Sequence, residues 1–191
     1  MRRYSDFNLN ALWFLIAANV LVFIITLVRG ATIFFYLGLI PALLLNHPWT
    51  IITNLFVHGG LWHILFNMIS LYFLGSFLFR LVGERSFLGV FFLGGIVGNI
   101  FYIFLGPQNV PGIGASGAIF AVGAALTMIA PRVRVLVFPI PVPMPLWAAM
   151  TLFLVISFFA AGIAWQAHLG GFLFGLLAGY LFKRKGRTYY I

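Results

Sequence analysis

The sequence contains no cysteine and very little charge. Without cysteine, the chain has no disulfide, no thiolate nucleophile and no cysteine-based metal site. Charged residues make up 7% of its 191 residues, whereas a soluble globular protein has roughly a quarter. Hydrophobic residues make up 63% and form long runs, each close to the ~20 residues that cross a bilayer. The composition therefore predicts a single-domain, all-α, polytopic membrane protein over residues 1–191.

Acidic residues are scarcer still, because Asp6 and Glu84 are the only two. The eleven basic residues give the chain a net charge of +9, which in a soluble protein would suggest a nucleic-acid partner. In a membrane protein, basic residues instead anchor the cytoplasmic ends of the helices. Their placement along the chain decides between these two explanations.

Six apolar segments are predicted to cross the membrane. They cover residues 9–28, 61–79, 87–105, 116–130, 145–161 and 167–182. The first is longer than a signal-peptide core and no clear cleavage site follows it, so we expect it to be retained. Residues 29–60 are apolar but interrupted by prolines and a Gly-Gly pair, and we expect a long membrane-associated outer loop there.

This topology separates the basic residues by side. With the N-terminus in the cytoplasm, ten of the eleven fall on the cytoplasmic side and only Arg29 falls outside. An even number of crossings then leaves the C-terminus cytoplasmic as well. The lipid bilayer therefore explains the positive charge, and we expect a multi-pass protein of a cell membrane with no nucleic-acid partner.

Polar side chains gather near the outer ends of three predicted helices. They are His58, His63, Asn67, Ser116, Gln166 and His168. Because the second, fourth and sixth helices all run from outside to inside, these side chains are expected at one depth. Polar groups are unfavourable inside a membrane and tend to mark functional sites. We therefore predict a site that opens to the extracytoplasmic side.

The chemistry available at this site is limited. A serine needs a base within hydrogen-bond reach to act as a nucleophile, and His168 is the candidate base for Ser116. Both acids are predicted to be cytoplasmic, so a hydrolase here would use a Ser–His dyad. Removing the acid from a soluble triad lowers turnover about 10⁴-fold, so we expect slow catalysis. Alternatively, Ser116 is only a small residue that lets two helices pack closely, and His168 only an interfacial histidine.

Two residues of the second helix are placed to bind a developing negative charge. His63 and Asn67 are four apart, so they lie on one helix face and could both donate hydrogen bonds to an oxyanion. The backbone N–H of Ser116, at a predicted helix start, offers a further donor. Gly114 leaves room beside it for a substrate backbone to approach.

Small residues on the sixth helix predict close helix packing. Gly171, Gly175 and Gly179 are each four apart and form a stripe without side chains. On the fourth helix, Ala121 and Ala125 offer a complementary face. Close approach of these two backbones would bring the candidate nucleophile and the candidate base together.

Three motifs in the chain resemble those of the rhomboid family of intramembrane serine proteases. They are HGGLWHILFNM at residues 58–68, GASG at 114–117 and AHLGGFLFG at 167–175. GxSG alone is a weak motif, but the three in this order, on helices two, four and six, are highly specific. The resemblance covers about residues 48–182, which is most of the chain.

The resemblance implies a fold and a role for each residue of the predicted site. The fold would be a compact six-helix bundle. Ser116 would be the nucleophile and His168 the general base and later the general acid, with His63, Asn67 and Gly114 at the oxyanion hole. The implied substrates are single-pass transmembrane proteins, cut in or next to their membrane segments near the outer leaflet. No cofactor and no metal are expected.

The chain departs from the family pattern at two positions. Family members often have Trp-Arg in the first loop, where this chain has Trp49 and Thr50, so an arginine-based role there is absent. A tyrosine often follows the serine by four residues and stacks on the histidine, and here that residue is Phe120. Phenylalanine stacks equally well, so we expect Phe120 to support the site by packing.

Two other functions remain open from the sequence. A rhomboid-like pseudoprotease would bind transmembrane helices without cutting them, although such proteins usually lack the serine or the histidine that this chain keeps. A small transporter or channel would need polar residues along a path through the membrane, whereas here they stop at one level. Both alternatives therefore explain the sequence less well than an intramembrane protease.

Overall fold

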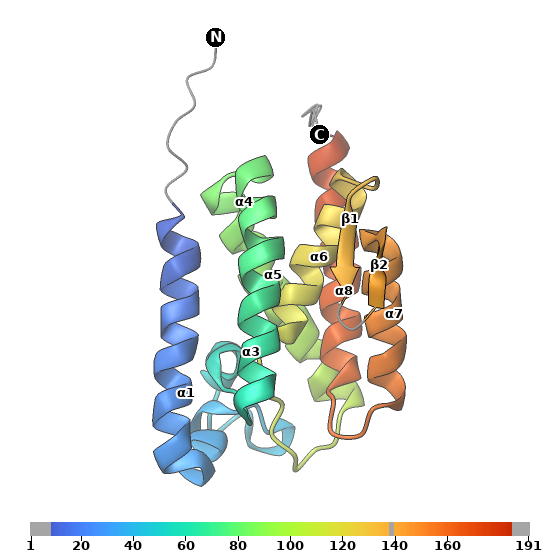
Figure 1. Cartoon of the computed structure of the whole chain (residues 1–191). Helices are drawn as coiled ribbons and strands as arrows, with labels where there is room; N and C mark the ends of the chain where they lie inside the picture. The colour runs from blue at the N-terminus through green and yellow to red at the C-terminus, as the bar shows by residue number, and fades with distance from the viewer. Residues whose placement is uncertain (1–8, 138–139, 185–191) are drawn as a thin grey trace.

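The computed structural model describes residues 9–137 and 140–184, and it is a bundle of helices that run side by side (Figure 1). The longer helices are α1 (Asn10–Leu37), α3 (Leu61–Ser70), α5 (Glu84–Leu105), α6 (Ser116–Ile129), α7 (Leu146–Phe159) and α8 (Trp165–Arg184). The short elements are η1 (Pro41–Leu43), α2 (Thr50–Thr53), η2 (Asn54–Phe56), the π-helical turn η3 (Leu71–Gly75) and α4 (Ser76–Val82). Two strands, β1 (Arg134–Val137) and β2 (Ile140–Pro145), complete the described fold.

Helix α1 is longer than the sequence predicted. The backbone leaves helical geometry at Arg29, with φ −125° and ψ 32°, and then resumes the helix to Leu37. The expected boundary at residue 28 therefore marks a kink, and the segment expected as a loop from residue 29 begins with two further helical turns. No proline interrupts residues 30–37, so nothing in the backbone chemistry stops the helix before Gly38.

A small β-hairpin corrects the all-α expectation. Strands β1 and β2 pair antiparallel, with Arg134 opposite Pro145 and Val135 opposite Met144. Prolines at alternate positions of β2 cannot donate backbone hydrogen bonds, which excludes a helix and suits an edge strand. Figure 1 shows the hairpin beside α7 and α8, near the end of the bundle where α8 finishes.

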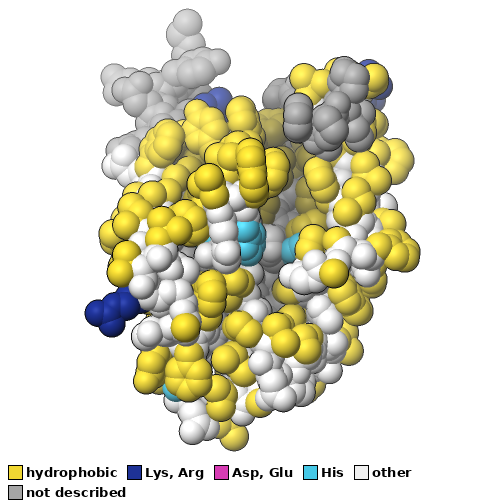
Figure 2. Space-filling view, turned by 60° about the horizontal axis from the view of Figure 1, so that its bottom comes forward, with side chains coloured by type: hydrophobic (Ala, Val, Ile, Leu, Met, Phe, Trp, Pro, Cys, Tyr) yellow, Lys and Arg dark blue, Asp and Glu magenta, His cyan; other side chains and the backbone are white. Residues whose placement is uncertain are grey.

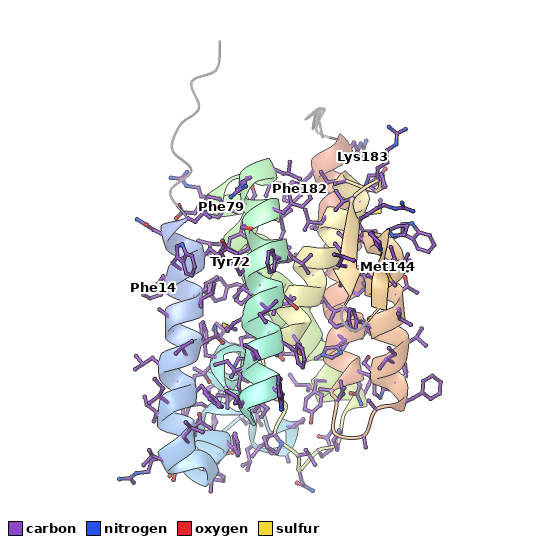
Figure 3. The ribbon with its side chains drawn as sticks, viewed as in Figure 1. Phe14, Tyr72, Phe79, Met144, Phe182 and Lys183 are labelled. Atoms are coloured by element: carbon purple, nitrogen blue, oxygen red, sulfur yellow. The ribbon has the colours of Figure 1, made fainter. Side chains whose placement is uncertain are left out.

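The exterior of the bundle is apolar. Among the described residues, three helical segments are long and apolar enough to cross a membrane: Asn10–Leu37, Leu61–Val82 and Glu84–Leu105. Helices α6 and α7 are also apolar but have only 14 residues each. Large side chains such as Phe14, which is 73% exposed, point away from the bundle (Figure 3). Such an apolar surface suits contact with lipid. Tyr72 instead lies between two helices, where its ring contacts Trp13 of α1.

The centre of the bundle is built on backbone contacts between α6 and α8. The glycine stripe of α8 faces α6, with Gly171 against Gly117 and Gly175 against Ala121. A Cβ atom added at Gly175 would overlap the Ala121 backbone. Helix α5 also packs on α6, because Gly94 lies against Ala121. Helix α6 is buried along most of its length, and its N-terminus is therefore held in a fixed position.

A methyl group in the α6–α8 contact should destabilise the protein. We expect Gly175→Ala to lower the free energy of unfolding by at least the ~1–3 kcal/mol typical of an overpacked core, because the new Cβ meets rigid backbone. Thermal unfolding of the detergent-purified protein measures this. The control is Gly89→Ala on α5, where a Cβ would meet nothing within 4 Å and helix propensity favours alanine. Equal unfolding temperatures for the two variants would contradict the packing argument.

Candidate active site

Ser116 and His168 lie in hydrogen-bond contact. The Ser116 Oγ and His168 Nε2 atoms are 2.7 Å apart. Ser116 is the first residue of α6, and His168 lies in the first turn of α8. Gly117 follows Ser116, and Gly171 lies three residues after His168. The contact between these two glycines brings the two helix starts together. The structure thus joins the candidate nucleophile to the candidate base.

One of the two neutral tautomers of His168 would allow it to act as a base toward Ser116. For Nε2 to accept the Ser116 hydroxyl hydrogen, the ring hydrogen must sit on Nδ1. Nδ1 is buried and has no hydrogen-bond partner in the described structure. Glu84, the one acid among the described residues, is the first residue of α5. Gly98 of the same helix lies against Ala167, so Glu84 is 14 residues, or about 21 Å by helix rise, from the level of His168, and no carboxylate of the described residues orients the imidazole.

Phe120 holds the imidazole of His168 from one face. The two rings stack with centroids 4.5 Å apart and planes 23° apart. Phe120 lies one helical turn after Ser116, so its ring projects over the same end of α6. His168 is itself only 7% exposed. Ring stacking and burial therefore restrict the orientation of the imidazole, a role that a carboxylate has in a Ser–His–Asp triad.

His63 directs an N–H group toward Ser116. The backbone N–H of Gly59 donates to His63 Nδ1 over 3.3 Å, so Nδ1 accepts and the ring hydrogen sits on Nε2. A Cβ built at Gly114 would lie 2.6 Å from His63 Nε2 and 3.8 Å from Ser116 Oγ. Gly114 has φ +112°, which favours glycine, and its missing side chain leaves the space between the two residues open.

Asn67 lies one helical turn after His63 on α3 and lines the same cavity. Its amide nitrogen donates to the His63 carbonyl over 2.7 Å, which uses one of its two hydrogens. The amide oxygen is buried without a partner in the described structure. The second amide hydrogen is therefore the one that Asn67 has left for a ligand.

His58 differs from the other histidines near the site. Its side chain is fully buried, its Nδ1 lies 3.3 Å from the Phe56 carbonyl, and its ring meets that of His63 with centroids 4.9 Å apart. Burial, and secondarily the neighbouring His63, lowers the pKa of His58 to about 3. His58 is therefore neutral near neutral pH and packs behind His63 rather than facing the cavity.

A cavity of about 690 Å³ collects the polar residues that the sequence singled out. His63, Asn67, Ser116, Gln166 and His168 all line it, whereas His58 does not. Its apolar walls include Trp62, Phe66, Val110, Ile163 and Trp165. The space-filling view looks onto this end of the bundle and shows histidine side chains inside a hollow between hydrophobic surfaces (Figure 2). Ser116 therefore lies on the wall of a cavity that five of the six predicted polar residues share or border.

Sequence reasoning missed three polar residues beside the site. Asn54, Asn99 and Tyr102 line a small second cavity that also touches Ser116. The Tyr102 hydroxyl donates to the Val110 carbonyl over 3.1 Å, in the loop that leads to Ser116. The available signal was Asn99, a polar side chain within an apolar segment, which by itself marks an intramembrane position of interest.

Comparison with known proteins identifies similar sequences. A family model described as Rhomboid domain matches residues 45–185. YdcA of Bacillus subtilis, whose name classes it with the rhomboid proteases, is 33% identical over 143 residues, or 74% of this chain and 71% of that protein. The rhomboid protease GluP of the same organism is 30% identical over 130 residues, or 68% of this chain.

The relatives also include a protein named as inactive. RHOMBOID-like protein 8 of Arabidopsis thaliana, which carries that description, is 36% identical over 91 residues, or 47% of this chain. The chain spans about a quarter of the length of this protein and of GluP, at 26% and 25%. The similar proteins therefore include both a named protease and a protein named as inactive.

Protonation of His58 should destabilise the protein at acidic pH. The unfolded chain takes up this proton near the ordinary pKa of 6.5, whereas the folded chain does so only near 3. Below about pH 6.5 the unfolded state therefore binds more protons, and the free energy of unfolding falls by up to about 1.4 kcal/mol per pH unit. Thermal unfolding at pH 7.5 and at pH 5 measures the fall, with His58→Leu as the comparison. A variant that loses as much stability as the wild type would rule out this role for His58.

Proposed function

Because the chain belongs to the rhomboid family, we propose that it is an intramembrane serine endopeptidase that cuts other membrane proteins in or next to their transmembrane segments. The observation that carries this proposal is the 2.7 Å contact between Ser116 Oγ and His168 Nε2 within a large cavity. A serine used only for helix packing needs no histidine nitrogen at this distance. No metal or cofactor takes part in the chemistry proposed here.

The first half of the reaction forms an acyl-enzyme. Ser116 Oγ attacks the carbonyl carbon of the scissile peptide bond while His168 Nε2 takes the hydroxyl proton. The carbonyl oxygen becomes an oxyanion in the space beside Gly114, where His63 Nε2–H points. The free hydrogen of the Asn67 amide and the N–H groups at the start of α6 are the further donors. When the C–N bond breaks, His168 returns the proton to the leaving amine.

The second half of the reaction releases the product. A water molecule from the cavity gives a proton to His168 Nε2 and attacks the acyl carbon. The second tetrahedral intermediate uses the same donors, and His168 then returns the proton to Ser116 Oγ as the ester bond breaks. Without an acid on Nδ1, the imidazolium has less stabilisation than in a triad. We therefore expect slow turnover, given the ~10⁴-fold loss in soluble enzymes deprived of the acid.

We also propose six membrane crossings, with both ends in the cytoplasm of a cell and the site opening to the opposite side. The first residue of α1 and the last of α8 lie at one end of the bundle (Figure 1). The basic residues near that end include Arg80, Lys183 and Arg184, at the ends of α4 and α8. Helices α6 and α7 span only about 21 Å each, so the chain beyond them would complete those crossings.

The proposed substrates are single-pass transmembrane proteins. An extended peptide segment is needed at Ser116, because a helical backbone hides its carbonyl carbons from a nucleophile. The apolar cavity walls, including Trp62 and Phe66, suit the apolar side chains of such a segment. A membrane segment that unwinds easily near its outer end is therefore the expected type of substrate.

Covalent labelling tests the proposal without knowledge of the substrate. The detergent-purified protein is treated with a fluorophosphonate probe beside Ser116→Ala and His168→Ala, after each is shown to be folded. We expect labelling of the wild type at neutral pH and none of either variant, because the nucleophile or its base is missing. Ser157→Ala is the matched control, since Ser157 is a buried serine that donates to a backbone carbonyl of α7.

The outcomes separate the candidate functions. Labelling that disappears only in Ser116→Ala and His168→Ala supports the dyad. Labelling that persists in Ser116→Ala would place the reactive serine elsewhere. A folded wild type that stays unlabelled even after long exposure would make the chain a helix-binding pseudoprotease, in line with the relative named as inactive.

A further inference from the structure

Two buried asparagines bind each other next to the nucleophile. Asn54 lies in η2 of the first loop and Asn99 on α5, and each is 3% exposed. The Asn54 amide nitrogen donates to the Asn99 side-chain oxygen over 2.9 Å, and the Asn99 amide nitrogen donates back over 2.8 Å. The reciprocal pair therefore fixes the first loop against α5.

Each asparagine has one amide hydrogen left, and each is used on a backbone carbonyl. Asn99 donates its second hydrogen to Ile51 over 2.8 Å, and Asn54 donates its second to Gly112 over 3.3 Å. All four amide hydrogens of the pair are thus bonded. A buried polar network that is fully satisfied holds one geometry rather than several.

The pair is connected directly to the segment that carries the nucleophile. The Gly112 backbone exchanges two hydrogen bonds with Leu39, of 2.8 and 3.0 Å, which fix one side of the segment. The backbone carbonyl of Asn54 accepts a bond of 2.9 Å from the Gly114 N–H. Asn54 therefore contacts residues 112 and 114 at once, with its side chain and with its backbone. Ser116 follows two residues later.

We propose that Asn54 and Asn99 form an amide clamp that sets the position of Ser116 relative to His63 and His168. The clamp holds residues 112–114, and Gly114 in turn borders both His63 Nε2 and Ser116 Oγ. These asparagines act as positioning residues, since the bonds described for them go to each other and to backbone. This inference rests on the proposed function, because the position of Ser116 matters in this way only if it is the nucleophile.

Amide side chains suit the clamp for a chemical reason. An amide carries both donors and an acceptor without charge, so two amides can bond reciprocally and still donate once more each. A carboxylate in place of either amide would face carbonyl oxygens without a hydrogen to donate. A leucine has a similar outline and offers neither group, so it removes the bonds with little change in shape.

The test measures how fast the fluorophosphonate inactivates Ser116 at saturation, and separately the probe concentration that gives half that rate. We expect Asn54→Leu and Asn99→Leu to lower the saturating rate at least about tenfold and up to about 100-fold, as for a nucleophile displaced by about 1 Å. The half-saturating concentration should change by less than about twofold, because the cavity walls that bind the probe are untouched.

A double variant and two controls separate positioning from general stability. If the pair acts as one unit, Asn54→Leu with Asn99→Leu should react no more slowly than the slower single variant. Thr53→Val removes a bond from the first loop to the Leu37 carbonyl without touching residues 112–114. Asn19→Leu removes a buried amide from α1. Thr53→Val should lower the unfolding temperature, and both controls should leave the saturating rate at the wild-type value.

Each result decides the matter. A wild type that never reacts at Ser116 would overturn the proposed function and this inference with it. A reactive wild type whose Asn54 and Asn99 variants keep its rate, or lose no more than the controls, would overturn the clamp alone. The clamp would also be overturned if the fold-loss in saturating rate of the double variant equalled the product of the two single-variant losses. If a leucine variant does not fold, Asn54→Ser or Asn99→Ser takes its place, and an unchanged saturating rate there overturns the clamp equally.

Discussion

The close approach of two helix backbones is the interaction on which the rest of the structure depends. Helices gain little hydrophobic free energy by associating in lipid, so they must fit each other at van der Waals distance. Where α6 meets α8, Gly171 and Gly175 leave no side chain between the backbones. The hydroxyl of Ser116 and the imidazole of His168 meet because these helices touch. The contact between Ser116 and His168 is thus a consequence of backbone packing at Gly171 and Gly175.

In the described structure no carboxylate holds the His168 imidazole, and its surroundings restrict the ring instead. Phe120 stacks on the His168 ring, and burial limits the positions that the ring can take. Behind Ser116, the first loop is held by bonds between neutral amides and by backbone hydrogen bonds. A neutral framework suits a membrane interior, where a buried carboxylate would need an ionic partner.

The sequence predicted the helical class and the residues that meet at the cavity, because both follow from local patterns. Apolar runs indicate helices, and glycines four apart lie on one helix face. Gly171 and Gly175 therefore predicted a close contact with another helix. The continuation of α1 to Leu37 was not predicted, because Arg29 interrupts the apolar run without ending the helix. The hairpin was not predicted either, because the prolines of β2 are unusual in a strand. The Asn54–Asn99 pair joins positions 45 residues apart, and no spacing rule within one element connects them.

The long separation of Ser116 and His168 in the sequence has a consequence for synthesis. Ser116 precedes His168 by 52 positions, and His168 lies on the last described helix. A growing chain therefore inserts its serine into the membrane well before the histidine has left the ribosome. During that interval the Ser116 hydroxyl has no imidazole beside it. Assembly order thus delays formation of the proposed dyad until α8 packs against α6.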